Sequence, residues 1–161
     1  MTEFEQIYRA YFQDVELYLR AISHNESLAE ELTEQVFFQA LNALPKFRGD
    51  CDVRTWLCSM ARNAYLSHLR KERPSQPIDE LEISDPKQAV EEQIMDAQQA
   101  MAVHRVLHDL PEPYKEVFSL RVFGQLPFGD IGSLFGRTAN WACVTYHRAR
   151  QKIRDEMGEY V

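Results

Sequence analysis

The C-terminal stretch Leu126–Met157 constrains the fold most, because it has the pattern of two helices joined by a tight turn. Apolar residues in Phe128–Phe135 predict a short first helix with one inward face. Gly136 follows where the chain must reverse, and glycine adopts positive φ at little cost. Thr138 predicts the start of the second helix, since its hydroxyl can accept a hydrogen bond from a free N–H of the first turn.

The second helix of this hairpin has an apolar stripe and a cationic front. The stripe follows helical spacing and consists of Ala142, Tyr146, Ala149 and Ile153. No acidic residue lies between Arg137 and Arg154, and the basic residues off the stripe are Arg148, Arg150, Lys152 and Arg154. Such a helix, held across a short partner helix, is typical of a helix-turn-helix that binds DNA. An ordinary amphipathic hairpin with a solvated basic face explains the same stretch.

The composition is that of a globular, all-α protein. Hydrophobic residues make up 45% and charged residues 27% of the 161 residues, and only six glycines and seven prolines interrupt long periodic segments. No apolar run approaches the roughly 18 residues of a membrane span, and the N-terminus has no secretory signal. We therefore expect a cytoplasmic protein with no membrane contact of its own. The three cysteines lack zinc-ligand spacing, so we expect reduced thiols and no metal.

The net charge of −7 is unusual for a DNA-binding protein, but it is unevenly distributed. Residues 1–73 carry a net charge of −2, residues 74–111 of −6 and residues 112–161 of +1. Lys46–Arg73 is locally basic, with seven bases against three acids. Since affinity for duplex DNA comes mainly from neutralising phosphates, two modest basic patches on an acidic chain predict weak DNA binding unaided. We expect a specificity module that depends on a larger partner for most of its affinity.

The N-terminal half is predicted to form helices at Glu3–Ile22, Leu28–Leu44 and Thr55–Arg73. Ser27 is the expected N-cap of the second helix, with Glu30 completing a capping box. The third helix is expected to place Trp56 or Leu57 in the core. Its outer face is expected to carry Arg62, Asn63, His68, Arg70 and Lys71.

Pro74–Pro86 has the composition of a flexible linker, with three prolines and four acids. Helical periodicity resumes at Lys87–Leu110 and again at Tyr114–Phe123. The predicted organisation has three parts: a first domain at 1–73, a linker at 74–90 and a second domain at 91–161.

Four fragments follow one another along nearly the whole chain: AEELTEQVFFQAL (Ala29–Leu41), FRGDCDVRTWLCSMARNAYLSHLRKER (Phe47–Arg73), LHDLPEPYKEVFSLRVFGQL (Leu107–Leu126) and YHRARQKIR (Tyr146–Arg154). In this order they resemble the bacterial extracytoplasmic-function (ECF) sigma factors, which have only the second and fourth sigma domains. The resemblance implies two small helical domains, a sigma domain 2 bundle and a sigma domain 4 helix-turn-helix. It also implies an alternative sigma factor that binds core RNA polymerase and directs promoter-specific initiation.

The first fragment looks like the helix with which the family binds the polymerase clamp. An acidic strip can pair with basic residues of the clamp while an aromatic ring fills a pocket. Without the resemblance, the same strip is a solvated helix face. The residues that the resemblance assigns to core-polymerase binding are Glu30, Glu31, Glu34, Gln35 and Phe38.

The second fragment looks like the segment that melts the promoter and recognises the minus-10 element. Arg48 can hold a backbone phosphate while nearby loop and helix residues form a pocket for a base drawn out of the stack. Trp56 is equally well explained as a core residue. The residues that the resemblance assigns to the minus-10 element are Phe47, Arg48, Trp56, Arg62 and Asn63.

The last two fragments look like the unit that recognises the minus-35 element, with N-terminal side chains of the second helix at base edges and basic residues at phosphates. The assigned residues are Trp141, Cys143, Val144, His147, Arg148 and Arg150. Trp141 and Cys143 replace the usual small and basic residues, so we expect contacts to thymine methyls or readout of DNA shape. Gly129 and Gly132 are expected to weaken the preceding helix by roughly 1 kcal/mol each.

The expected partners are core RNA polymerase, promoter DNA and, by resemblance, an anti-sigma factor, with no cofactor. A free-standing DNA-binding regulator is an alternative, although it leaves Phe47–Arg73 and the acidic strip unexplained. An enzyme is a further alternative, raised by His24, His68, His104, His108 and His147. His104 and His108 share a helix face and form a candidate metal pair. No third ligand, nucleophile motif or phosphate loop accompanies them, so we expect no catalytic residue.

Overall fold

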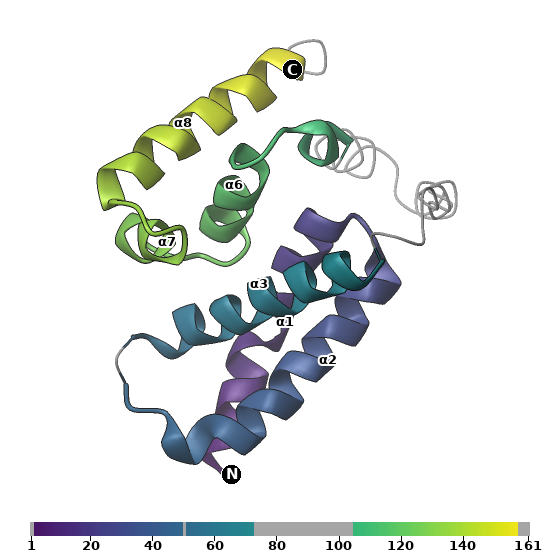
Figure 1. Ribbon diagram of the computed structural model, residues 1–161, viewed down its shortest axis with the longest axis vertical. Helices are drawn as coiled ribbons and strands as arrows, with labels where there is room; N and C mark the ends of the chain where they lie inside the picture. Colours follow the sequence, from purple (N-terminus) through teal and green to yellow (C-terminus); the bar gives the residue numbers. More distant parts are fainter. Residues whose placement is uncertain (1, 50, 73–104, 158–161) are drawn as a thin grey trace.

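The computed structural model describes residues 2–49, 51–72 and 105–157, and no β-strand occurs in these ranges. The helices are α1 (Glu3–Ser23), α2 (Glu26–Ala43), the 3-10 helix η1 (Leu44–Lys46), α3 (Val53–Glu72), α6 (Tyr114–Val122), α7 (Phe128–Leu134) and α8 (Ala139–Glu156) (Figure 1). For these residues the predicted all-α fold is confirmed. The predicted linker Pro74–Pro86 and most of the predicted helix Lys87–Leu110 lie outside the described residues, although 105–109 are helical.

The turn between α1 and α2 is capped by a residue other than the predicted one. His24 ends α1 in the left-handed conformation, at φ 55°. The following residue, Asn25, is extended, and its side-chain oxygen accepts a hydrogen bond from the amide of Leu28 at 3.0 Å. The prediction that Ser27 caps α2 is therefore wrong, because the chain reverses at His24 and Asn25 already meets the free amide.

The first unit consists of α1, α2 and α3, which enclose one apolar core. The buried side chains lie on the faces that helical periodicity predicted. Full burial of a valine or leucine side chain stabilises the fold by about 1.5–3 kcal/mol. The buried side chains include Val15, Leu19, Leu32, Val36, Leu57 and Ala61. This core fixes the direction in which the outer faces of α2 and α3 point.

The second unit consists of α6, α7 and α8, in which α7 and α8 form the predicted hairpin. Gly136 has a φ of 68°, and the hydroxyl of Thr138 accepts a hydrogen bond from the amide of Trp141 at 3.0 Å. Both predictions are confirmed. Ala142 and Ala149 are fully buried, so the apolar stripe of α8 faces inward as expected.

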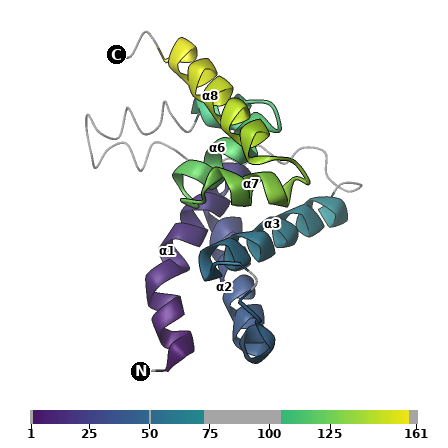
Figure 2. The same ribbon diagram turned by 90° about the vertical axis from the view of Figure 1, so that its left-hand side faces the viewer.

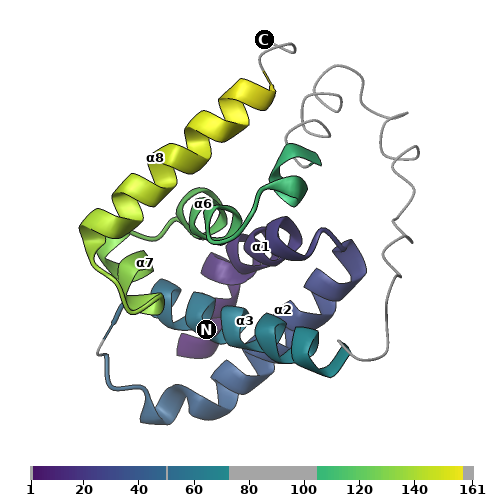
Figure 3. The same ribbon diagram turned by 45° about the horizontal axis from the view of Figure 1, so that its top comes forward.

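The two units pack directly against each other. In all three overall views α7 lies against α3, and α6 lies beside α1 (Figures 1, 2 and 3). Five residues of the second unit belong to the same buried cluster as the core of the first: Val117, Leu120, Leu126, Ile131 and Ala142. A smaller cluster joins Ala21 of α1 to Leu107, Leu110 and residues of α8. The two units therefore share an apolar interface.

Candidate nucleic-acid interface

The outer face of α8 carries most of the side chains assigned to the minus-35 element. Val144 is 39% exposed, and His147, Arg148 and Arg150 are also exposed. The residues between them that face the rest of the second unit are buried: Ala142, Thr145 and Ala149. Because the small residues face inward, the opposite face of α8 is exposed. It is cationic and carries one aliphatic side chain near its N-terminal end.

The turn before α8 adds an arginine that the sequence-based site did not include. Trp141 is half-buried, with its ring 5.3 Å from the ring of Phe135, and the guanidinium of Arg137 lies 5.4 Å from its centroid. Cys143 is also half-buried. Trp141 therefore anchors the start of α8 as well as bordering its outer face. Arg137 could have been assigned to the site from the sequence, because it begins the stretch up to Arg154 that contains no acidic residue.

Two aromatic rings stack where the loop after η1 meets α3. The rings of Phe47 and Trp56 lie 4.5 Å apart at an angle of 28°, and both side chains are half-buried. Arg48, which follows Phe47 in the chain, and Asn63, two helical turns after Trp56, are both exposed. The structure therefore makes Trp56 part of the edge of the core and leaves part of its surface accessible. The two interpretations of Trp56 are compatible.

Arg62 lies in a different place from the one predicted. Its Nε donates to Oε2 of Glu116 on α6 at 2.5 Å, and its guanidinium lies 4.4 Å from the ring centroid of Phe135. Only 19% of its side chain is exposed. The expectation that Arg62 stands on a solvent-exposed outer face of α3 is wrong, because the second unit covers this part of the helix. Its assignment to DNA stays a prediction.

The surroundings of this ion pair are acidic. Burial, followed by the charge of Glu116, raises the pKa of Glu112 above the usual carboxyl value. Burial also raises the pKa of Tyr65 to about 12, with a further contribution from Glu112. The positive charge of Arg62 therefore lies near two carboxylates, Glu112 and Glu116.

The acidic strip of α2 lies on the surface, as predicted. Glu30, Glu31, Glu34 and Gln35 are all exposed, and Phe38 is 67% exposed. Leu41, which the site prediction did not include, is 46% exposed one turn later. Two large apolar side chains next to a row of acids are unusual for a solvated helix and typical of a protein-binding surface.

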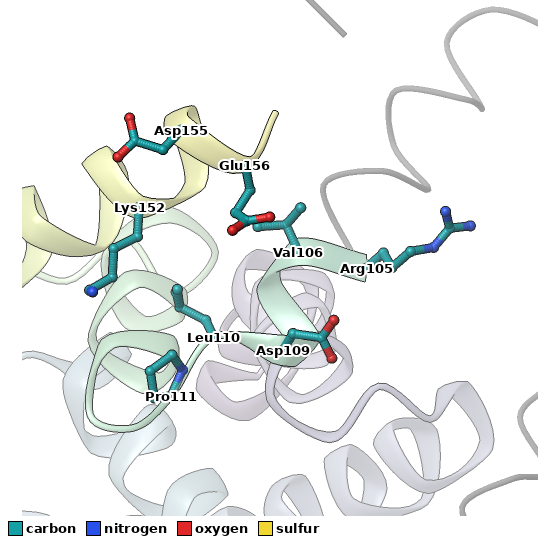
Figure 4. A pocket seen from close by; sticks show the side chains of 8 residues that line it. All are labelled: Arg105, Val106, Asp109, Leu110, Pro111, Lys152, Asp155 and Glu156. Carbon is teal, nitrogen blue, oxygen red and sulfur yellow. The ribbon is translucent and has the colours of Figure 1, made fainter. Parts of the chain in front are cut away.

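The described residues contain no group of three side chains that could hold a metal ion. His108 stacks on His24 with ring centroids 4.3 Å apart, while His104 of the candidate metal pair lies outside the described residues. A hollow of about 610 Å³ lies between the end of α8 and residues 105–111 (Figure 4). Its lining mixes acids, bases and apolar residues. No helix in the described ranges is long and apolar enough to cross a membrane.

Comparison with known proteins matches both units to one family. Residues 7–74 match the model of sigma-70 region 2, and residues 100–153 match that of sigma-70 region 4. The RNA polymerase sigma factor YlaC of Bacillus subtilis is 26% identical over 161 residues, covering 95% of this chain and 91% of its own length. The ECF RNA polymerase sigma factor SigM of B. subtilis is 26% identical, covering 93% and 92%.

Two solved structures share the fold. The sigma factor RpoE in complex with the anti-sigma factor NepR, from Bartonella quintana, has a TM-score of 0.79 at 18% identity and covers 98% of each chain. CnrH in complex with the cytosolic domain of CnrY has a TM-score of 0.70 at 16% identity, covering 97% of this chain and 88% of CnrH. The exposed cationic helix, the two matched regions in order and the shared fold agree. The chain is an ECF-type RNA polymerase sigma factor with sigma-70 regions 2 and 4, a non-enzymatic initiation factor that acts with core polymerase and promoter DNA.

Proposed function

We propose that this sigma factor recognises the minus-35 element with the outer face of α8 and the minus-10 element with α3 and the loop before it. The observation that carries the proposal is the exposed cationic face of α8. The proposed boundaries are region 2 at 1–73, a linker at 74–90 and region 4 at 91–161. The cytoplasm, where RNA polymerase transcribes, is the proposed site of action.

On α8, base contacts and phosphate contacts are proposed to come from different side chains. Val144 has exposed methyl groups that suit the C5-methyl of thymine, and His147 lies one turn further along the same face. Cys143 and Trp141 border this face. Arg148 and Arg150 then meet the sugar-phosphate backbone, which positions the helix without reading sequence.

For the minus-10 element, the stacked pair of Phe47 and Trp56 is proposed to support an extruded base. A base outside the stack gains about 1–3 kcal/mol from stacking on an aromatic side chain. Arg48 is exposed beside Phe47 and can hold a phosphate. Asn63 is exposed two turns beyond Trp56 and can bond a base edge or a sugar.

The exposed face of α2 is proposed to bind the core-polymerase clamp. Phe38 is the anchor, because a ring 67% exposed on a folded helix loses most of its contact with water when a partner covers it. Around it, an acidic rim steers a basic partner and sets its orientation. The rim consists of Glu30, Glu31, Glu34 and Gln35.

An anti-sigma factor is proposed as a further partner. Support comes from the two structural neighbours, of which one is a complex with the anti-sigma factor NepR and the other a complex with the cytosolic domain of CnrY. Affinity purification of the chain from cells, followed by transcription assays with any stoichiometric protein recovered, tests this. A recovered protein that blocks initiation supports the proposal, and failure of every recovered protein to affect initiation contradicts it.

The main test is a gel shift with and without core RNA polymerase, on promoters selected from random DNA by the reconstituted holoenzyme. The holoenzyme is expected to bind selected promoters and start transcription at physiological salt. The chain alone is expected to bind them weakly, since its basic patches are small and its net charge is −7. Tight specific binding by the chain alone would contradict the proposal, as would failure of core polymerase to associate.

A further inference from the structure

Asn140 is an exposed residue in the first turn of α8 that the sequence-based site did not include. At about 100° per residue, positions 140, 144 and 147 fall within about 60° of one another, and position 140 falls about 160° from the buried Ala142. Asn140, Val144 and His147 therefore form one row along the outer face of α8. In Figures 1 and 3 this helix lies at the edge of the molecule, with α6 and α7 on its inner side.

The fold makes no use of the side-chain amide of Asn140. Within the described part of the chain, this amide has no hydrogen-bond partner. The cap of α8 comes from another residue, because the hydroxyl of Thr138 accepts a hydrogen bond from the amide of Trp141 at 3.0 Å. Asparagine also has a lower helix propensity than alanine, so Asn140 does not help α8 to form. Its side-chain oxygen and its NH2 group are both available to a ligand.

The turn that carries Asn140 is held in place by its neighbour Trp141. The ring of Trp141 lies 5.3 Å from the ring of Phe135, and the guanidinium of Arg137 lies 5.4 Å from its centroid. Trp141 is therefore directed toward the hairpin, and Asn140 is the side chain that projects at the start of the row. Because the backbone is fixed, only the side-chain torsions of Asn140 lose freedom when it binds.

The row changes character at its C-terminal end. Gln151 is the next residue along it and carries an amide as well. Its Nε2 donates to Oδ1 of Asp155 at 3.0 Å, and Asp155 is followed by Glu156. These two carboxylates repel phosphates, so this end of the row is unsuited to a duplex. The end that suits DNA is the one that begins with Asn140.

An asparagine amide matches one base in the major groove. Its oxygen accepts from N6 of adenine while its NH2 group donates to N7, a bidentate pair that no other base offers. Val144 lies about 6 Å further along the helix axis, since each residue adds 1.5 Å, and successive base pairs are about 3.4 Å apart. A thymine methyl that meets Val144 is therefore expected one or two base pairs from that adenine.

We propose that Asn140 reads an adenine in the minus-35 element through bidentate hydrogen bonds to N6 and N7, with a thymine one or two base pairs away in contact with Val144. This inference rests on the proposed role of the outer face of α8 in minus-35 binding. It makes the amide of Asn140 the main polar determinant of sequence at the start of the helix. Trp141 and Cys143, both half-buried, border this contact.

The test compares the wild-type chain with Asn140→Ala and Gln151→Ala, each reconstituted with core RNA polymerase. Gln151→Ala is the control, because it removes an exposed amide from the other end of the same row. Promoter selection from random DNA measures the base preference at each minus-35 position. Asn140→Ala is expected to lose about tenfold of the preference for adenine at one position, whereas Gln151→Ala is expected to change no position. Circular dichroism checks that both variants stay folded.

A modified base tests the hydrogen bond itself. 7-Deazaadenine at the affected position lacks the N7 acceptor and still pairs with thymine. It is expected to weaken promoter binding by the wild-type holoenzyme about fivefold, as for the loss of one hydrogen bond. It is expected to leave binding by the Asn140→Ala holoenzyme unchanged, because that variant has no amide to donate. A purely structural role of Asn140 would make the two holoenzymes respond alike.

Unchanged base preferences in Asn140→Ala overturn the inference. A lost preference for a base other than adenine overturns it too, as does equal weakening of both holoenzymes by 7-deazaadenine. In each of these cases the wild-type holoenzyme still selects a minus-35 element, so the proposed function stands. Selection of promoters with no minus-35 preference at all by the wild-type holoenzyme contradicts the proposed function and the inference with it.

Discussion

Gly132 and Thr138 lie so close that a Cβ atom on Gly132 would meet the carbonyl group of Thr138, whose carbon would be only 2.7 Å away. The amide of Arg137 also donates to the carbonyl oxygen of Gly132 at 2.8 Å. The glycine in α7 is therefore required by the tight crossing of α7 and the start of α8. The same contact sets the angle at which α8 leaves the hairpin.

Gly132→Ala is expected to destabilise region 4, because its methyl group has no space and backbone must move. Overpacking of this kind costs about 1–3 kcal/mol. Urea unfolding measures the change in the free energy of unfolding. Gly129→Ala is the matched control: its Cβ would meet nothing within 4 Å, so it is expected to stabilise α7 by about 0.5–1 kcal/mol. Equal effects of both substitutions would contradict this account.

Phe38→Ala is expected to weaken binding to core polymerase by tenfold or more with little change in stability. The reason is that truncating an anchor residue buried in an interface costs about 2 kcal/mol of binding free energy. Its ring is 67% exposed, so the folded chain loses few contacts. Fluorescence anisotropy with core polymerase measures the Kd. The neighbouring Phe37 is 2% exposed, and Phe37→Ala is expected to cost about 3–5 kcal/mol of stability instead. Unchanged affinity of Phe38→Ala would remove α2 from the interface.

Arg150→Ala is expected to weaken holoenzyme binding to all promoters about equally. The slope of log K against log salt concentration is expected to fall in magnitude by about 1, because one phosphate contact is lost. Val144→Ala is expected to change which base is preferred at one position of the minus-35 element. Promoter selection at several salt concentrations measures both effects. Arg9→Ala, which removes the same charge from an exposed position on α1, is expected to change neither.

The stacking of Phe47 on Trp56 is expected to contribute to the stability of the folded chain. A double-mutant cycle with Phe47→Ala and Trp56→Ala is expected to give about 0.5–1.5 kcal/mol in the free energy of unfolding, the usual range for an aromatic pair. Each single variant is also expected to slow promoter melting by the holoenzyme, followed by permanganate reactivity of unpaired thymines. Wild-type melting in both variants would leave the pair a purely structural role.

Glu112→Gln is expected to stabilise the chain at pH 7. Burial and the charge of Glu116 raise the pKa of Glu112, so the ionised carboxyl is disfavoured in the folded chain. In the wild type, the contribution of Glu112 to the free energy of unfolding is therefore fully present below the ordinary carboxyl pKa of about 4.3. It is lost as the pH rises through the raised pKa of Glu112 in the folded chain. The glutamine oxygen can still accept the hydrogen bond from the amide of Glu116, which spans 3.1 Å.

The stabilising effect of Glu112→Gln is expected to shrink as the pH falls from 7 toward 4. Thermal unfolding of variant and wild type across this range measures it. An effect that stays constant with pH would show that the raised pKa of Glu112 is not its cause.

Features that depend on neighbours within a few residues were predictable. Gly136 and Thr138 set the turn and the cap of α8 through local backbone preferences, and both were confirmed. The stripe of α8 was equally predictable, since helical spacing alone decides which side chains share a face. The cap of α2 was missed because two polar residues two positions apart, Asn25 and Ser27, both suit an N-cap, and the turn at His24 selects between them.

By itself the sequence determined the helices, the hairpin, the cationic face of α8 and the surface strip of α2, because each follows from periodicity and local capping. Only the tertiary structure decided where Arg62 points, why Gly132 must lack a side chain and which face of α3 is covered. Arg62 and Glu116 are 54 residues apart in the chain, and no local pattern links them. Their pairing comes from the packing of region 4 on region 2, which depends on shape and charge over the whole interface.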